Sequence, residues 1–224
     1  MASKLFESYA IHMKLLLTSA GLSHKVIGRS LENLVAKPAS DTKVAFIPTA
    51  ANVESGNHHW MVRQFVDLWQ YGFQWIDVVD PSAADVDWRN RLREVDVLYV
   101  SGGNTFYLLD QVRKTGFDTW LRENIDKKVY VGGSASTILM TPTIAVAGLE
   151  PGDDNLPKLT DLTGLGYVDF EVEPHCDAAR IKAVKAYADT SPNSVYAIDD
   201  LTAIQVVDGA VSVVSAGSWR LYDT

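Results

Sequence analysis

The fold class that the sequence predicts is α/β: a doubly wound, mostly parallel sheet with helices on both faces and a C-terminal β-hairpin. Short apolar runs alternate with amphipathic stretches over the first two-thirds of the chain, as strands alternate with helices. The apolar runs are continuous, which is typical of parallel strands covered on both faces. Near the C-terminus, Asp208-Gly209 separates two short apolar runs and favours a hairpin turn.

The spacing of apolar residues places each element in chain order. Strands are predicted at residues 14–18, 44–47, 75–79, 97–100, 129–131, 167–172, 195–198, 203–207 and 211–214. Helices are predicted around residues 27–35, 61–69 and 106–112, and at 88–95, 117–125 and 178–188. Residues 148–164 are rich in Pro, Gly, Asp and Asn, and predict a long irregular loop of the kind that often carries function.

Length and composition exclude several classes of protein. With 224 residues, the chain is expected to form one domain over residues 13–224, after an N-terminal extension at residues 1–12. A formal net charge of −8, without any basic run, argues against nucleic-acid binding. Cys176 is the single cysteine, so no internal disulfide can form and a reducing compartment is expected. No apolar run is long enough to span a membrane. We expect a cytoplasmic protein that is either a monomer or a homodimer.

The strongest candidate site is the turn Gly132-Gly133-Ser134-Ala135-Ser136, between a predicted strand and a helix. In open α/β sheets, ligands bind beyond the carboxyl ends of the strands, where this turn lies. A serine on such a sharp turn exposes its hydroxyl, and the amide of Ala135 can stabilise an oxyanion. The alternative is an ordinary turn in which Ser134 is the N-cap of the helix. The turn alone leaves both interpretations open.

A second turn, Ser101-Gly102-Gly103-Asn104-Thr105, follows another predicted strand. Its backbone amides can form an anion-binding nest, in which Gly103 supplies a second oxyanion donor. Plain turn chemistry explains a lone Gly-Gly pair equally well. The two turns together favour an oxyanion hole, because holes of this type take their donors from two separate loops.

A serine nucleophile requires a base, and His175 is the best placed histidine because it follows a predicted strand downstream of Ser134. The other histidines lie in the extension or near the starts of helices: His12, His24, His58 and His59. The acid that orients the imidazole is expected at Asp199 or Asp200, after the strand at 195–198. Neighbouring side chains point to opposite sides, so only one of the two can face the histidine.

Two other kinds of chemistry are not expected. Cys176 is adjacent to His175, but adjacent side chains on extended backbone diverge, which argues against a cysteine nucleophile. No spacing of His, Cys, Asp or Glu resembles a metal-ligand set, so we expect neither a metal nor a cofactor.

Five segments, taken in order, resemble the peptidase E (aspartyl dipeptidase) family of serine peptidases. They are Leu15-Leu16-Leu17-Thr18-Ser19, Phe46-Ile47-Pro48-Thr49-Ala50, Gly102-Gly103-Asn104-Thr105-Phe106, Gly133-Ser134-Ala135 and Glu173-Pro174-His175. The resemblance extends from about residue 13 to residue 221. It implies a flavodoxin-like fold of the class I glutamine amidotransferase type and a small peptide as substrate.

The resemblance also implies a role for each site residue. Ser134 would be the nucleophile, His175 the base and Asp200, in preference to Asp199, the acid. The oxyanion hole would be formed by the backbone amides of Gly103 and Ala135. The substrate-binding positions would be Gly102, Asn104 and Thr105.

The chain departs from the family motif Gly-Trp-Ser-Ala-Gly, since Gly133 replaces the Trp and Ser136 the last Gly. Both replacements are small, so we expect the turn to survive. The family also binds the substrate aspartate with an Arg in a longer segment after the His. Here Arg180 is the nearest Arg after His175, in a predicted helix whose apolar positions turn it toward solvent. Strict aspartyl specificity is therefore not expected.

The sequence thus predicts a cofactor-free serine peptidase that acts on short peptides or another small amide. One alternative is a binding protein that has kept the fold and lost the chemistry. Another is a nucleotide-binding protein that uses residues 102–105, although this turn lacks both a Gly-x-Gly-x-x-Gly pattern and a phosphate-binding Lys.

Overall fold

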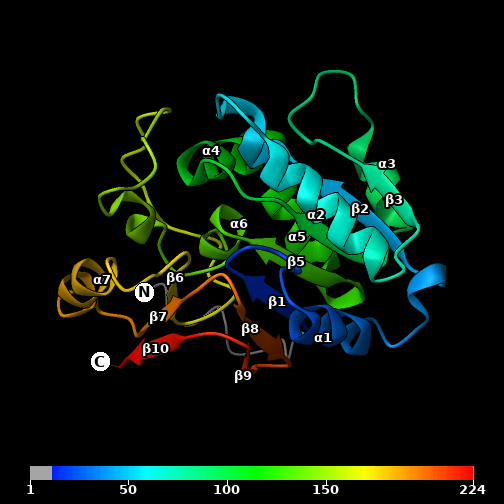
Figure 1. The fold of residues 1–224 in the computed structure, drawn as a ribbon. Helices are drawn as coiled ribbons and strands as arrows, with labels where there is room; N and C mark the ends of the chain where they lie inside the picture. Colours follow the sequence, from blue (N-terminus) through cyan, green and yellow to red (C-terminus); the bar gives the residue numbers. More distant parts are fainter. Residues whose placement is uncertain (1–11, 224) are drawn as a thin grey trace.

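A central sheet of parallel strands, extended at one edge by an antiparallel hairpin, organises the chain (Figure 1). The computed structural model describes residues 12–223, so all but the last residue of the predicted N-terminal extension lies outside the described residues. Within these residues the sheet has seven strands: β3 (Trp75–Val78), β2 (Lys43–Ile47), β4 (Val97–Val100), β5 (Val129–Gly133), β1 (Lys14–Thr18), β8 (Thr202–Val207) and β9 (Ala210–Ser215). The first five of these are parallel, and β8 and β9 form the predicted C-terminal hairpin.

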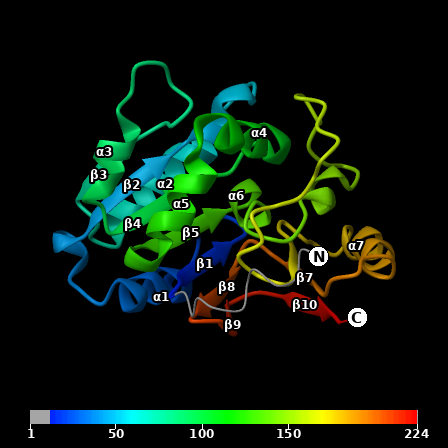
Figure 2. The same cartoon turned by 180° about the vertical axis from the view of Figure 1, so that it is seen from behind.

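Helices cover both faces of this sheet, which confirms the doubly wound α/β prediction (Figures 1 and 2). In β1, Leu16 packs with one set of helices, α1 (Lys25–Val35) and α2 (His59–Gln70). Leu15 and Leu17 pack with the other set: α3 (Trp88–Arg93), α4 (Thr105–Thr115), α5 (Phe117–Asn124) and α6 (Ala135–Ile138). Apolar residues on both faces explain why the strands read as continuous apolar runs.

Short 3-10 helices complete this part of the chain: η1 (Ala39–Asp41), η2 (Thr49–Val53), η3 (Ile125–Lys127) and η4 (Ala145–Gly148). Within residues 12–223, every helix is too short or too polar to span a bilayer.

A smaller sheet, which the sequence did not predict, packs beside the hairpin end of the central sheet. Its strands are β10 (Trp219–Tyr222), β7 (Val195–Ile198) and β6 (Glu171–Glu173), and α7 (Ile181–Ala188) packs against it. The predicted strand at 167–172 is wrong over its first four residues, because Tyr167 donates its amide to Met140 instead of a neighbouring strand. The helix predicted from residue 178 begins three residues later, since the Asp177 carboxylate binds the amides of Ala179 and Arg180.

The carboxyl ends of the strands from both sheets converge on one region. In the central sheet, β1, β4 and β5 are parallel neighbours, so the segments that follow them lie together. In the smaller sheet, β6 and β7 are also parallel and end near each other, where the amide of Cys176 donates to Ile198 O at 3.0 Å. Asp200 lies in the short connection from β7 to β8, which joins the two sheets.

Candidate active site

Ser134 lies on a strained turn between β5 and α6. Its backbone has φ 53° and ψ −110°, which a non-glycine residue rarely adopts. The turn is tight, because a Cβ added to Gly132 would lie 3.0 Å from backbone atoms of Ser136 and Thr137. Ser134 occupies the N-cap position of α6, yet its side chain makes no capping hydrogen bond. The hydroxyl is therefore free to face the neighbouring loops.

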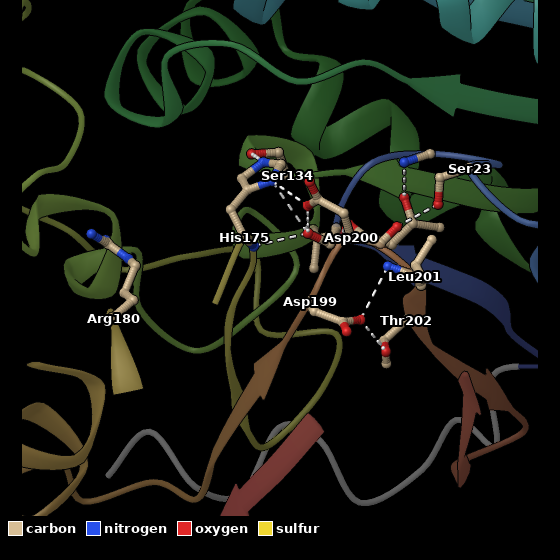
Figure 3. A network of polar contacts seen from close by, with 12 residues as sticks. Ser23, Ser134, His175, Arg180, Asp199, Asp200, Leu201 and Thr202 are labelled. Atoms are coloured by element: carbon tan, nitrogen blue, oxygen red, sulfur yellow. Dashed lines mark hydrogen bonds and ion pairs between the residues drawn. The ribbon is translucent and has the colours of Figure 1, made fainter. Parts of the chain in front are cut away.

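The Ser134 hydroxyl contacts His175, which in turn contacts Asp200 (Figure 3). Ser134 Oγ lies 2.9 Å from His175 Nε2, and His175 Nδ1 lies 2.6 Å from Asp200 Oδ1. The pKa of Asp200 is lowered, chiefly by the hydrogen bond from His175. Burial acts in the opposite direction, whereas the charge of His175 and the hydrogen bond from Ser19 lower the pKa further. The three predicted residues are thus joined in one hydrogen-bonded row with an anionic carboxylate at its end.

Asp199, the alternative acid, is used by its own turn. Its Oδ1 accepts hydrogen bonds from the amide of Leu201 at 3.0 Å and from the hydroxyl of Thr202 at 2.7 Å. Its Oδ2 accepts the amide of Ser218. These bonds hold the connection to β8, so that the next side chain, Asp200, faces the histidine (Figure 3).

Ser19, which the sequence analysis did not assign to the site, holds two members of the row. Its hydroxyl donates to Asp200 Oδ1 at 2.8 Å and accepts the backbone amide of His175 at 2.8 Å. Ser19 is fully buried, and the amide that it binds belongs to a residue with φ 53°. The signal that could have found it is its place directly after β1, at the same sheet edge as the turn of Ser134.

The turn after β4 lies beside Ser134. Gly103 has φ 132°, and an added Cβ would lie 2.3 Å from Ala50 O, so only glycine fits. A Cβ added to Gly102 would lie 3.2 Å from the Cβ of Ser134. Both glycines line a cavity that Ser134 also lines.

Asn104 and Thr105, the predicted substrate contacts, make bonds within the protein. The Asn104 side chain caps α4 by accepting the amide of Tyr107 at 2.8 Å, and it donates to Asp154 O at 3.0 Å. The Thr105 amide donates to Asp153 Oδ2 at 2.7 Å. These bonds attach the loop at residues 148–164 to the start of α4, so both residues position a wall of the site. Direct contact with substrate remains a prediction.

Ser136, which replaces a family glycine, strengthens the turn. Its buried hydroxyl accepts the amide of Gly133 at 2.7 Å and donates to Val100 O at 2.5 Å. It therefore bonds the turn to the end of the neighbouring strand β4. The side chain fits because it points into the sheet rather than toward the cavity.

Ser134 lies between two cavities. One, of about 930 Å³, extends along α2 and is lined by Gln64, Gly102 and His175 among others. The second, of about 560 Å³, lies under residues 150–153 of the predicted loop and reaches Glu173 and Arg180. The predicted loop thus forms a wall of this second cavity.

Arg180 corrects the expectation that its side chain faces solvent. The side chain is only 15% exposed and forms an ion pair with Glu173, which is 2% exposed. Its terminal nitrogens donate to Pro151 O at 2.6 Å and to Leu149 O at 3.1 Å. Arg180 precedes α7 rather than lying within it, so the apolar spacing of the helix did not apply. Burial raises the pKa of Glu173 to about 7, although Arg180 opposes this shift.

Among the described residues, none of the other candidate nucleophiles and bases contacts the Ser134 hydroxyl, although His59 lines the same cavity. Cys176 is buried, and burial together with Glu173 raises the pKa of its thiol to about 11, which disfavours the reactive thiolate. His24 caps α1, and His12 pairs with Asp208. Among the described histidines, His175 alone contacts the Ser134 hydroxyl.

Comparisons with known proteins agree on one family. Residues 15–214 match the model of peptidase family S51. An uncharacterized peptidase of Pasteurella multocida is 34% identical over 175 residues, covering 73% of this chain and 80% of the relative. An uncharacterized peptidase of Listeria innocua is 32% identical over 177 residues, covering 75% and 82%. Peptidase E of Nostoc sp. is 28% identical over 141 residues, covering 61% and 53%.

A solved structure supports the same relationship. The crystal structure of a Listeria monocytogenes EGD-e protein, provisionally named a peptidase E, superposes on this chain with a TM-score of 0.77 at 26% sequence identity. The match covers 92% of this chain and 99% of that protein.

The first prediction concerns the hydrogen bond from Ser19 to Asp200. Ser19→Ala removes one donor from the carboxylate, so the pKa of Asp200 will rise toward its ordinary value. Carbon-13 NMR titration of the aspartate carboxyl groups measures it. Ser23→Ala is the matched control, because the Ser23 hydroxyl binds the backbone carbonyl of Asp200 and not its carboxylate. An equal shift in both variants would contradict the assignment.

The second prediction concerns the buried pair of Glu173 and Arg180. In the folded protein the pKa of Glu173 is raised from 4.5 to about 7. The stability that protonated Glu173 contributes is therefore fully present below pH 4.5 and is lost as the pH rises through 7. Glu173→Gln cannot ionise, so the free energy of unfolding will fall less between pH 5 and 8, by on the order of 2 kcal/mol. Urea unfolding measures this, with exposed Glu123→Gln as control. Parallel pH curves for wild type and Glu173→Gln would refute it.

Proposed function

The chain belongs to peptidase family S51, and from this premise we propose that it hydrolyses short peptides with Ser134 as nucleophile, His175 as base and Asp200 as the orienting acid. That it is a peptidase, of a serine-type family, follows from the family itself. The observation that carries the finer proposal is the row of hydrogen bonds from Ser134 Oγ through His175 to Asp200.

Each member of the row has a chemical task in this proposal. Ser134 Oγ attacks the carbonyl carbon of the peptide while His175 Nε2 accepts its proton, 2.9 Å away. His175 Nδ1 donates to Asp200, which fixes the ring and stabilises the imidazolium that forms. The lowered pKa of Asp200 keeps this carboxylate ionised. The imidazolium then protonates the leaving amine, and water repeats the sequence on the acyl-enzyme.

The oxyanion of the tetrahedral intermediate would be bound by the backbone amides of Gly103 and Ala135. Among the described residues, neither amide donates to a protein acceptor. The two amides come from turns that follow the parallel neighbours β4 and β5, and donors from two separate loops are what an oxyanion hole of this type uses. Free amides held by rigid turns stabilise developing negative charge without reorganisation.

The walls of the site favour small substrates. The loop at residues 148–164 is attached to α4 by Asn104 and Thr105, and to the smaller sheet by Arg180. Arg180 is thereby unavailable as a clamp for a substrate aspartate, because its charge is paired with Glu173 and its donors bind loop carbonyls.

The two alternatives are less well supported by this geometry. Ser136 and Gly133 are compatible with the turn of Ser134, which weakens the argument from the altered motif for an inactive binding protein. In the turn at residues 102–105, the amide of Thr105 already binds the Asp153 carboxylate, which would repel a phosphate. A nucleotide site at this turn is therefore disfavoured.

The third prediction is that Ser134→Ala abolishes hydrolysis and leaves the fold intact. Loss of a serine nucleophile costs on the order of 10⁶-fold in kcat, whereas the hydroxyl makes no bond that caps α6. Dipeptide hydrolysis and thermal unfolding measure the two effects, and a fluorophosphonate will label wild type at Ser134 but not the variant. Retention of most activity by the purified variant would remove Ser134 from the mechanism.

The fourth prediction is that the enzyme is not a strict Asp-X dipeptidase. With Arg180 paired to Glu173, we expect kcat/KM for Asp-Leu to lie within about tenfold of the values for Ala-Leu, Ser-Leu and Gly-Leu, since one unmade clamp is worth about 2–4 kcal/mol. All four peptides are compared on one enzyme preparation. A preference for Asp-Leu above about a hundredfold that Arg180→Ala abolishes would show that Arg180 binds substrate after all.

A further inference from the structure

Gln64, on α2, places an amide nitrogen beside the nucleophile turn. Its side chain is 93% buried, and its Oε1 accepts the hydroxyl of Ser101 at 2.7 Å. Ser101 is fully buried after β4, so this bond fixes the orientation of the carboxamide. The opposite atom, Nε2, lies 3.5 Å from the position that a Cβ on Gly133 would occupy.

The Gln64 amide group faces the larger cavity. Gln64, Gly102 and Ser134 all line this cavity. Among residues 12–223, no acceptor is bound to Nε2, although the side chain is nearly buried. Because Gly133 has no side chain, nothing at that position covers the nitrogen. The nitrogen is therefore accessible from the cavity, where an oxygen atom of a ligand can accept its hydrogen bond.

Arg63 adds a positive charge to the same wall. Its Nε donates to Asp67 Oδ1 at 2.9 Å, which fixes the direction of the guanidinium. Its side chain is 70% exposed, lines the same cavity, and has terminal nitrogens without a protein acceptor among the described residues. Both residues belong to α2 and line the cavity, so the terminal nitrogens of Arg63 and the Gln64 amide nitrogen are donors on one wall, a combination that suits a carboxylate.

Four carboxylates line this cavity: Asp67 of α2 is paired with Arg63 and Asp200 is bound to His175, while the other two come from elements beyond α2. Glu54 follows η2, and Asp153 belongs to the loop at residues 148–164. Within the described residues neither carboxylate has an ion-pair partner, and after burial the charge of Asp153 is the next cause of the raised pKa of Glu54. A ligand carboxylate would be repelled from these two residues and directed toward α2.

We propose that Gln64 and Arg63 bind the free C-terminal carboxylate of the substrate, so that the enzyme selects short peptides whose C-terminus is unblocked. The proposal rests on the peptidase function argued above, because the same cavity reaches Ser134. It assigns the wall formed by α2 to the chain terminus of the peptide and leaves the smaller cavity, at Glu173 and Arg180, for the other end.

The test measures binding separately from catalysis. In the Ser134→Ala background, isothermal titration calorimetry compares Ala-Leu with its C-terminal amide, which lacks the carboxylate charge. We expect the amide to bind at least about tenfold more weakly, the loss typical of one charge-assisted hydrogen bond. Equal affinities, or no binding of Ala-Leu, would overturn the proposal.

Matched variants in the same background locate the contact. Gln64→Glu places a carboxylate against the carboxylate of the ligand. It will weaken the binding of Ala-Leu at least about tenfold and have little effect on the binding of the C-terminally amidated peptide. Gln70→Glu adds the same charge to an exposed position of α2, outside the cavity, and is the control. Arg63 is exposed, so Arg63→Gln is expected to fold. This variant will also reduce the preference for Ala-Leu over its C-terminal amide, whereas Arg29→Gln, at an exposed position of α1, will not.

Two outcomes separate this inference from the proposed function. If wild-type enzyme hydrolyses Ala-Leu and its amide equally well, and Ser134→Ala hydrolyses neither, the serine peptidase proposal stands and the carboxylate site is wrong. If Ser134→Ala binds the acid selectively but wild type hydrolyses no peptide, the carboxylate site stands and the catalytic proposal fails.

Discussion

The left-handed backbone at Ser134 is the constraint on which the site depends, and both neighbouring strands hold it in place. The amide of Ser134 donates to Thr18 O at the end of β1, and the hydroxyl of Thr137 donates to the same carbonyl. From the other side, the hydroxyl of Ser136 donates to Val100 O at the end of β4. Because β5 lies between these two strands, the turn cannot relax without breaking bonds to both.

The histidine and the acid reach Ser134 from a second sheet, so the site also depends on how the two sheets are joined. Asp199 closes the connection from β7 to β8 with its own carboxylate, and Asp200 is thereby turned toward His175. Ser19, at the end of β1, then bonds both the carboxylate and the backbone of the pair. One serine of the central sheet thus fixes the position of groups supplied by the smaller sheet.

The sequence predicted the parts of the site that follow from strand ends. Ser134, Gly103, His175 and Asp200 each follow a short apolar run, and ends of parallel strands meet at one edge of a sheet. The environment of Gln64 could not be predicted, because it depends on α2 packing against a turn nearly seventy residues away in the chain. The solvent-facing Arg180 was wrong for a related reason, since the ion pair with Glu173 depends on a loop and a strand that local spacing does not place. The smaller sheet was missed because its strands are short and pair across distant segments.

The four glycines around Ser134 differ in how much room each leaves for a side chain. An added Cβ would meet backbone atoms at 2.3 Å on Gly103, 3.0 Å on Gly132 and 3.1 Å on Gly102, so these positions are constrained by close backbone packing. On Gly133 the nearest atom is a side-chain nitrogen at the ordinary distance of 3.5 Å, and its backbone is not left-handed. A substitution at the residue beside Ser134 is therefore compatible with the turn. A larger side chain at position 133 would extend toward Gln64 Nε2 and change that wall of the cavity while the turn stays in place.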